Sequence, residues 1–218
     1  MPIMSFWRLD PDVIHLNHGS FGATPAPALE EQQRLRDAME SNPTRWFLAD
    51  YQPSLDEARW KVAGFLGADP AGLAFVNNAT EGVNSVLRSL EAELRPGDEI
   101  VVTDHEYNAC RNAAVVTAAR TGARVVPATI PFPLQSAREV TDSVLGVVTA
   151  RTRLLMVDAV TSPTALIFPL EEIVAALEPE VQVLVDAAHA PGMIDFDVTA
   201  VPAPALSPSA GRPGRSGK

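Results

Sequence analysis

The sequence predicts an α/β fold in which a mostly parallel β-sheet is covered by helices on both faces. Strand-like and helix-like segments alternate from residue 73 to residue 185. The strand-like segments are short apolar runs, as expected of parallel strands that are buried on both faces. The helical segments between them supply the crossover connections that parallel strands require. Since such crossovers are right-handed, the carboxyl ends of all the strands should lie at one edge of the sheet.

The elements follow in order along the chain. Residues 13–24 form a polar loop punctuated by glycine, and two prolines then open a helix. The first helix is expected over 28–40 and ends at Asn42-Pro43, and a second runs over 54–66 and ends at Gly67. After it we expect strands over 73–76, 99–103, 124–129, 153–157 and 181–185, and helices over 80–94, 108–121, 136–149 and 170–177.

Composition divides the chain into three parts. Residues 1–50 form an amino-terminal loop and helices, and residues 51–198 form a large, partial ligand-binding domain that contains the alternating pattern. Residues 199–218 contain four prolines and three basic residues but no acidic residue, and they show no helix or strand period. That composition is typical of a disordered tail.

The overall composition narrows the class of protein. Hydrophobic residues make up 46% of the chain, which is enough for a sizeable core. The net charge of −10 argues against nucleic acid and anionic membranes as partners, because phosphate groups require basic surfaces. We find no membrane-spanning or export segment and no metal-binding motif. Cys110 is the only cysteine, so no internal disulfide can form, and a cytoplasmic location is expected.

Polar residues gather directly after the predicted strands, where a ligand of an open α/β sheet binds. Residues 77–82 follow the first strand and open a helix, whose free N–H groups suit an anion. His105 follows the second strand, Ser162 follows the fourth, and Asp186 and His189 follow the fifth.

Each of these residues also has a simpler interpretation when it is taken alone. Asn78 or Thr80 could only cap a helix, His105 could be a satisfied surface group, and Asp186 could cap the turn after its strand. A carboxylate at the end of a buried strand is nevertheless costly without a cation or hydrogen-bond donors. Together, the anion cradle, the imidazole, the hydroxyls and the carboxylate predict a flat heteroaromatic cation that carries a phosphate.

Five motifs extend this interpretation to a family. They are H-L-N-H-G-S-F-G-A-T-P at 15–25, N-N-A-T-E-G-V-N at 77–84, T-D-H-E-Y-N at 103–108, V-T-S-P-T-A-L at 160–166 and V-D-A-A-H-A-P-G at 185–192. With these motifs the chain resembles class V aminotransferases, which are fold-type I enzymes dependent on pyridoxal 5'-phosphate (PLP), and within them the isopenicillin N epimerase-like group. The resemblance covers nearly all of residues 10–198. It implies a three-layer PLP-transferase-like large domain with a mostly parallel sheet, incomplete at the C-terminus.

The resemblance also implies roles for particular residues. Ala79 and Thr80 would bind the PLP phosphate, His105 would stack on the ring, and Asp186 would pair with the protonated ring nitrogen. His189 and Ser162 would lie near the ring's 3-oxygen. The loop of Asn17, His18 and Gly19 would cover the amino-acid substrate. At Ala159 the family pattern has a histidine, so that contact is missing from this chain.

The family's reaction also requires a Schiff-base lysine, which the pattern places some thirty or forty residues beyond the Asp186 motif. The chain has two lysines, Lys61 in an early helix and Lys218 at the end of the tail, and neither occupies that position. We therefore expect that this chain has no catalytic lysine. We also expect that it is a truncated or frame-shifted copy, whose reading frame departs from the family pattern near Thr199. In the family's strand order, two absent strands would lie between the strand at 73–76 and the other four. Translation of the encoding DNA in its other two reading frames, beyond codon 199, tests this hypothesis.

Two functions remain open. The first is an amino-acid-processing enzyme, an isomerase (epimerase), transferase (aminotransferase) or carbon–sulfur lyase, which in this family is a homodimer. Cysteine desulfuration is disfavoured, because the resemblance implies that the reactive cysteine of those enzymes would lie in the missing part, and Cys110 is expected to be a small buried hydrophobic residue. The second is a non-catalytic remnant that binds PLP weakly or dimerises with a partner. A nicotinamide-binding fold is excluded, since no G-x-G-x-x-G follows the first strand.

Overall fold

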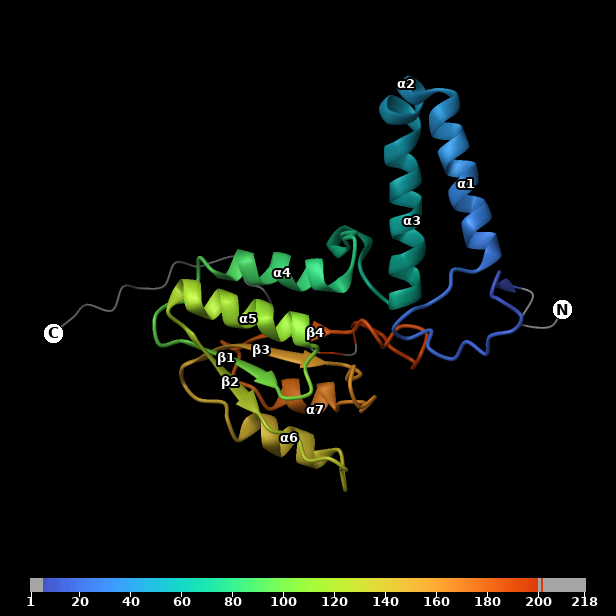
Figure 1. The fold of residues 1–218 in the computed structure, drawn as a ribbon. Helices are drawn as coiled ribbons and strands as arrows, with labels where there is room; N and C mark the ends of the chain where they lie inside the picture. Colours follow the sequence, from blue (N-terminus) through green and yellow to red (C-terminus); the bar gives the residue numbers. More distant parts are fainter. Residues whose placement is uncertain (1–5, 200, 202–218) are drawn as a thin grey trace. The chain divides into compact units, whose positions relative to one another are not determined.

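The computed structural model describes residues 6–199 and 201 (Figure 1). The chain divides into two compact units, Met1–Phe65 and Leu66–Lys218, which are considered separately below. Of the predicted tail at 199–218, residues 200 and 202–218 lie outside the described residues. Within the described part of the chain, no helix is long and apolar enough to cross a membrane.

The first unit consists of helices. They are α1 (Ala26–Ser41), α2 (Pro43–Arg45), the π-helical turn η2 (Trp46–Asp50) and α3 (Tyr51–Leu66). Asn42 ends α1 as predicted, but the expected gap before residue 54 is wrong, because Pro43 occupies the first position of the next helix. A proline is tolerated there, and the Asn42 side chain accepts a hydrogen bond from Arg45 N at 3.1 Å, which caps the new helix.

These helices bury little of their apolar surface within the described chain. Ala63 is the one residue of α1 and α3 that is fully buried. Large apolar side chains such as Leu48, Trp60 and Phe65 are exposed by more than half. Packing within this unit therefore contributes little to its stability, since helices in water depend on burial of an apolar face.

The second unit contains a four-stranded parallel sheet in the order β2-β1-β3-β4. Its strands are β1 (Glu99–Thr103), β2 (Arg124–Ala128), β3 (Thr152–Asp158) and β4 (Gln182–Asp186). Its helices are η3 (Pro70–Gly72), a short 3-10 turn, then α4 (Ala79–Leu90), α5 (Asn108–Thr121), α6 (Arg138–Leu145) and α7 (Leu170–Ala175).

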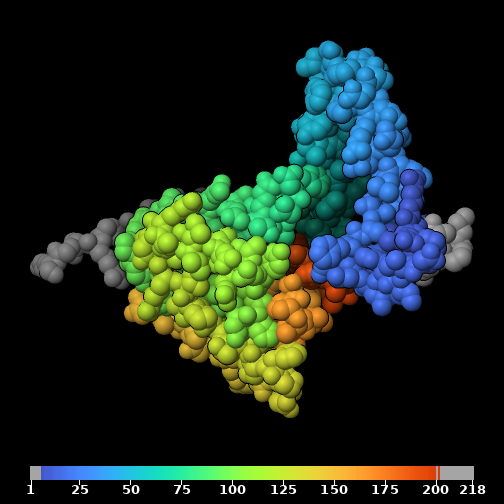
Figure 2. Space-filling view, in the orientation of Figure 1, coloured from blue at the N-terminus to red at the C-terminus, as the bar shows by residue number. Residues whose placement is uncertain are grey.

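The helices cover both faces of this sheet, so the predicted three-layer architecture is confirmed (Figure 1). On one face α4 and α5 pack on alternate strand residues, including Ile100, Leu154 and Met156. On the other face α6 and α7 pack on the residues between them, including Leu155 and Val157. Figure 2 shows α4 and α5, in green and yellow-green, lying side by side as one helical layer. Burial on both faces explains the continuous apolar runs of the strands.

The predicted strand at 73–76 is wrong. These residues form no strand, and the side chains of Phe75 and Val76 are each about half exposed. A strand needs a neighbouring strand to take up its backbone N–H and C=O groups, and the sheet order of the second unit offers residues 73–76 no such neighbour. Three predicted helices are also shorter than expected: α6 covers 138–145 rather than 136–149, α4 ends at Leu90 rather than at residue 94, and α7 ends at Ala175 rather than at residue 177.

Strand β4 lies at an edge of the sheet, and its residues 182–185 are half-buried. Its pairing with β3 places Asp186 directly beside Asp158, the last residue of that strand. Two acidic residues therefore end two neighbouring parallel strands, and this register forms the basis of the candidate site.

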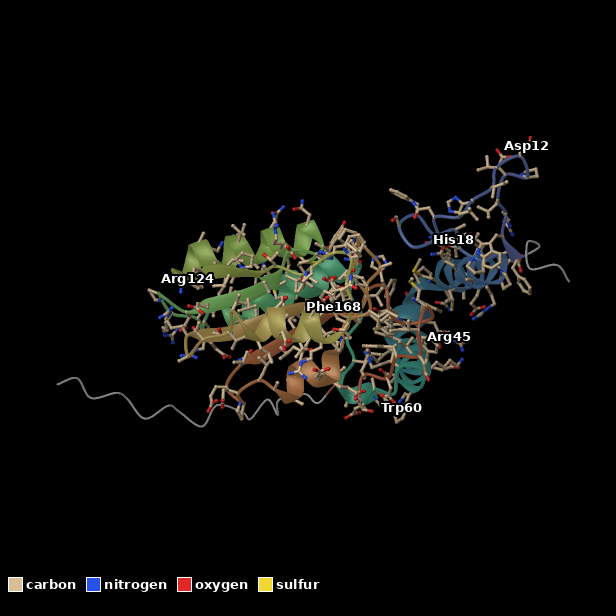
Figure 3. All side chains as sticks on the ribbon, turned by 90° about the horizontal axis from the view of Figure 1, so that it is seen from below. Asp12, His18, Arg45, Trp60, Arg124 and Phe168 are labelled. Atoms are coloured by element: carbon tan, nitrogen blue, oxygen red, sulfur yellow. The ribbon has the colours of Figure 1, made fainter. Side chains whose placement is uncertain are left out.

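The opposite end of the sheet carries a buried ion-pair network. The carboxylate of Glu99 is fully buried and accepts hydrogen bonds from Arg124, Arg151 Nε at 2.9 Å and Thr149 Oγ1 at 2.7 Å. Burial alone would raise the pKa of Glu99, but these donors hold it at about 2. Arg124 is labelled in Figure 3 at this amino-terminal end of the strands, far along the sheet from the site described next.

Candidate active site

The candidate site lies at the carboxyl end of the parallel strands. In Figure 1 the amino-terminal ends of α4 and α5 lie at the same end of the sheet as the carboxyl ends of β1, β3 and β4. This arrangement follows from right-handed crossovers between parallel strands, as the sequence predicted. Loops that are far apart in the sequence therefore present their polar residues to one region.

The amino-terminal end of α4 offers a place for an anion. The Asn78 side chain accepts a hydrogen bond from Glu81 N at 2.9 Å, so Asn78 does cap this helix. That capping leaves the N–H groups of Ala79 and Thr80 in the first turn, where no backbone acceptor precedes them. The Thr80 hydroxyl forms no hydrogen bond within residues 6–199 and 201, and Thr80 is half-buried. These groups and the helix dipole suit a phosphate.

His105 is fixed by a hydroxyl pair from another loop. Its Nδ1 lies 2.7 Å from Thr164 Oγ1, which in turn lies 2.8 Å from Thr161 Oγ1. Thr161 also accepts a hydrogen bond from Leu166 N at 2.8 Å. The loops after β1 and β3 are thereby joined, and the imidazole is held in one orientation with its side chain only 12% exposed. His105 is therefore a positioned group and not a free surface histidine.

Asp186 ends β4 with its carboxylate turned inward, and the residue is 9% exposed. Its Oδ1 accepts a hydrogen bond from Ala188 N at 2.9 Å, and its Oδ2 lies 3.4 Å from the Cys110 thiol. Within the described part of the chain, no Lys, Arg or His side chain forms an ion pair with Asp186. The carboxylate is thus oriented and available to a cation from outside the protein.

Two further buried carboxyl groups, which the sequence analysis missed, lie beside Asp186. Glu106 is 5% exposed and Asp158 is 2% exposed, and Glu106 Oε2 and Asp158 Oδ2 have no hydrogen-bond partner within the described residues. Burial and the charge of Asp186 raise the pKa of Glu106 to about 7, and burial and the charges of Glu106 and Asp186 raise the pKa of Asp158 to about 8. Two features of the sequence could have indicated these groups: Glu106 lies within the T-D-H-E-Y-N motif, and Asp158 ends the apolar run of β3.

Cys110 is a fully buried free thiol, as predicted. Burial and the neighbouring Asp186 carboxylate raise the pKa of Cys110 to about 12, so the group is a neutral thiol at physiological pH. It acts here as a weak hydrogen-bond donor to Asp186 and not as a nucleophile.

The remaining predicted residues are less tightly placed. His189 is half-buried and Ser162 is exposed, and neither side chain makes a hydrogen bond to the described residues. Ala159, which stands where the family pattern has histidine, is buried, and its N–H is donated to Asp186 O at 2.8 Å. Asn17, His18 and Gly19 belong to the first unit, so their role toward a substrate stays a prediction.

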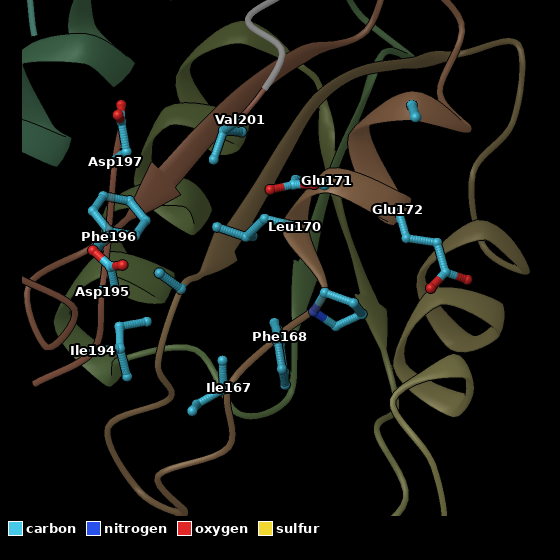
Figure 4. A pocket seen from close by; sticks show the side chains of 13 residues that line it. Ile167, Phe168, Leu170, Glu171, Glu172, Ile194, Asp195, Phe196, Asp197 and Val201 are labelled. Carbon is cyan, nitrogen blue, oxygen red and sulfur yellow. The ribbon is translucent and has the colours of Figure 1, made fainter. Parts of the chain in front are cut away.

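A large open cavity of about 810 Å³ lies against α7 in the second unit, and Ala159 is among the residues that line it (Figure 4). Apolar side chains, including Ile167, Leu170 and Phe196, line it, and the acidic residues Glu171 and Asp195 also border it. Among the described residues that line it, there is no basic group that could bind a phosphate and no histidine to stack on a ring. The volume of a cavity therefore does not locate the site. The polar groups at the carboxyl ends of the strands locate it instead.

The arrangement can bind one kind of ligand well. It combines an anion cradle at α4, a fixed imidazole at His105 and a carboxylate at Asp186 that lacks a cationic partner. A flat aromatic ring with a protonated nitrogen and a phosphate substituent would satisfy all three.

Comparison with known proteins identifies the family of the chain. The chain belongs to the aminotransferase class-V family, whose model matches residues 23–210. It is 37% identical to the isopenicillin N epimerase of Amycolatopsis lactamdurans over 196 residues, covering 89% of this chain and 49% of that protein. It is 32% identical to a putative L-cysteine desulfhydrase of Oryza sativa subsp. japonica, covering 88% and 43%. The chain thus spans about half the length of the curated relatives it matches.

Solved structures show the same fold. A variant of C-DES with glycine covalently linked to its PLP cofactor matches with a TM-score of 0.78 at 25% identity, covering 88% of this chain and 51% of that one. The cysteine desulfurase CsdA of Escherichia coli matches with a TM-score of 0.73 at 26% identity, covering 85% and 47%. These matches, one of them to a structure with bound PLP, cover most of this chain and confirm the predicted PLP-transferase-like fold.

Proposed function

We propose that this chain provides the cofactor-binding part of a PLP-dependent enzyme that processes an amino acid. One observation carries the proposal: Asp186, His105 and the first turn of α4 come to the same end of the sheet, and Asp186 has no cationic partner in the described chain. The relatives support it, because one is named as an epimerase of isopenicillin N and another as a putative desulfhydrase of the amino acid L-cysteine.

The residues of this chain have distinct parts in that function. Ala79 and Thr80 would hold the phosphate through N–H groups and a hydroxyl. His105, kept in place by Thr164, would lie against the ring and exclude water from that face. Asp186 would keep a proton on the ring nitrogen, where the carboxylate favours the charged form. When bound, PLP supplies an electron sink for the substrate carbon that loses a proton.

The group that binds PLP covalently and moves the substrate proton is proposed to lie outside this sequence. Lys61 is on the surface of α3, where its side chain is 74% exposed and pairs with Glu57 at 2.6 Å. Lys218, the other lysine, lies outside the described residues. We propose that the sequence is a fragment or a frame-shifted copy, and that the complete protein is a cytoplasmic homodimer whose Asn17, His18 and Gly19 cover the substrate. The two reactions named among the relatives, epimerisation and carbon–sulfur cleavage, both fit this part of the site.

A second candidate is a non-catalytic protein that binds PLP weakly or dimerises with a partner. The position and exposure of Lys61 favour it for the chain taken alone, since a Schiff-base lysine must reach the ligand that Asp186 holds.

Reduction with borohydride separates the two candidates. The purified chain is mixed with PLP, the visible absorbance is recorded, and the reduced product is digested and mapped by mass spectrometry. A lysine adduct that requires Asp186 would support a catalytic chain and would contradict the proposed absence of the lysine. Saturable quenching of protein fluorescence without an adduct supports a cofactor-binding part that lacks its lysine. If PLP binds equally well to the Asp186→Asn variant, the site assignment is wrong.

A further inference from the structure

The three acidic residues at the carboxyl ends of the strands are more than one ring nitrogen requires. Asp186 alone pairs with a single positive charge, yet Glu106 and Asp158 lie beside it and are at least as deeply buried. One oxygen from Glu106 and one from Asp186 lie within 4.8 Å of each other and of the Cys110 sulfur. Asp158 is the register partner of Asp186 on the neighbouring strand. The three carboxyl groups therefore form one cluster.

In the part of the chain that the structure describes, no basic side chain compensates the charge of this cluster. The groups that face it are Glu106 from the loop before α5, Cys110 from α5, Asp158 from β3 and Asp186 from β4. Glu106 Oε1 accepts a hydrogen bond from Tyr107 N at 3.1 Å, whereas its Oε2 and Asp158 Oδ2 have no partner. Nearby His105 is engaged with Thr164 and lies 3.9 Å from Asp104. Among residues 6–199 and 201, no basic side chain pairs with any of the three carboxyl groups.

Three carboxylates cannot all stay charged at this separation without a cation. In the free protein, some of them must therefore hold protons. Glu106 and Asp158 are the groups whose pKa is raised, mainly by burial and secondly by the neighbouring carboxylates, so they carry these protons.

We infer that Glu106 and Asp158 act behind Asp186 as a proton-holding pair, so that a cationic ring bound at Asp186 causes this pair to give up a proton. A ring that arrives protonated brings its own positive charge, and the pair releases H⁺ to solvent. A ring that arrives neutral takes the H⁺ from the pair onto its nitrogen. Either way, the complex contains one pyridinium and one more carboxylate than the free protein. Glu106 and Asp158 are thus positioning residues that act through Asp186, and the inference rests on the proposed function.

Proton counting by calorimetry tests this inference on the full 218-residue chain. The probe is pyridoxine 5'-phosphate, which has the ring and the phosphate but no aldehyde to react with lysine. Its heat of binding is measured at about pH 6 in buffers of different ionisation enthalpy, which gives the number of protons exchanged. The wild type should release about one proton more per ligand than the double variant Glu106→Gln, Asp158→Asn. Both substitutions imitate the protonated side chains, so the fold is retained.

The affinity ratio provides a second measure. Relative to the double variant, the wild type should gain affinity by up to about tenfold per pH unit between about pH 5 and pH 7, because one extra proton is released over that range. Glu172→Gln, an exposed acid on α7, is the matched control and should behave as the wild type. Equal proton counts in the wild type and the double variant would overturn the inference while leaving the proposed cofactor site intact.

Two further results would separate the possibilities. If the wild type binds no probe, the proposed function fails, and the infrared band of protonated carboxylic acids at neutral pH tests the inference instead. A band that is present in the wild type and lost in the double variant would support the proton-holding pair. A wild type without this band would overturn the inference. Cd²⁺ alone is also titrated. A thiolate-to-metal absorbance that disappears in Cys110→Ser would assign the cluster to a metal ion and overturn the inference.

Discussion

The buried carboxyl cluster makes a direct prediction for the stability of the free protein. Burial and the charges around them raise the pKa of Glu106 from 4.5 to about 7 and that of Asp158 from 3.8 to about 8. In the unfolded chain both groups return to ordinary values, so the unfolded chain loses its protons at lower pH than the folded protein does. The stability that these groups contribute is therefore fully present below about pH 4 and is lost as the pH rises through 7 and 8.

The size of this loss follows from the two shifts. Each pKa unit corresponds to about 1.4 kcal/mol, so Glu106 alone accounts for about 3 kcal/mol. Asp158 alone accounts for about 6 kcal/mol, and because the two acids raise each other's pKa, their effects overlap and the loss for the pair lies at about 6–9 kcal/mol. Since small domains unfold with about 5–15 kcal/mol, the free protein should be much less stable at high pH than at mildly acidic pH.

Urea unfolding monitored by circular dichroism measures this effect between about pH 5 and pH 9. The midpoint should fall steadily with pH in the wild type, and the fall should be smaller in Glu106→Gln, whose side chain cannot ionise. Glu172→Gln is again the control, because that acid is exposed on α7. A wild-type midpoint that is constant or rises over this range would refute the reasoning, because it would mean that the cluster does not hold protons in the folded state.

Three other substitutions test the fold and the site separately. Glu99→Ala should lower the free energy of unfolding by about 2–4 kcal/mol, because the buried Thr152 hydroxyl and the Thr149 hydroxyl lose their acceptor and Arg151 loses its ion-pair partner. A drop in Tm smaller than that of an exposed acid such as Glu172→Ala would contradict this expectation. Gly122→Ala should lower the free energy of unfolding by about 1–2 kcal/mol, since Gly122 has a φ of +74° and the added Cβ would lie 3.1 Å from Pro96. An unchanged midpoint of urea unfolding would contradict this expectation. Thr164→Val should leave the Tm nearly unchanged, but it should weaken the binding of pyridoxine 5'-phosphate several-fold, or by about 1 kcal/mol, because His105 loses the hydroxyl that orients it. Equal affinity of the variant and the wild type would show that this contact does not contribute to binding.

Much of the fold could be predicted from the sequence because local patterns agree with it. The segments at 99–103 and 108–121 form β1 and α5 with the expected bounds, since an apolar run and a helix ended by Gly122 are both local signals. The segment at 73–76 has the same apolar character, but whether it becomes a strand depends on a neighbour that local sequence does not reveal. The three prolines at 25, 27 and 43 are ambiguous for the same reason, since a proline can end one helix or begin the next.

The candidate site was predictable in part. Asp186 and His105 could be found because each follows a strand in a recognisable motif, and the structure places both at the carboxyl end of the sheet. Glu106 was overlooked, because a glutamate beside a histidine and a tyrosine resembles an ordinary surface residue. Its burial, like the register that pairs Asp158 with Asp186, arises only when separate strands come together. Charge clusters of this kind depend on tertiary structure and leave little trace in local sequence.

The most direct measurement is the affinity of the full chain for pyridoxine 5'-phosphate, compared between the wild type and Asp186→Asn. Asparagine keeps the acceptor for Ala188 N and removes only the charge. Loss of a charge partner at a buried site costs about 2–5 kcal/mol, so the Kd should rise by roughly 30-fold to several thousand-fold, while the free energy of unfolding without ligand should stay the same or increase. Equal Kd values for the two proteins would contradict the claim that Asp186 holds the cationic ring.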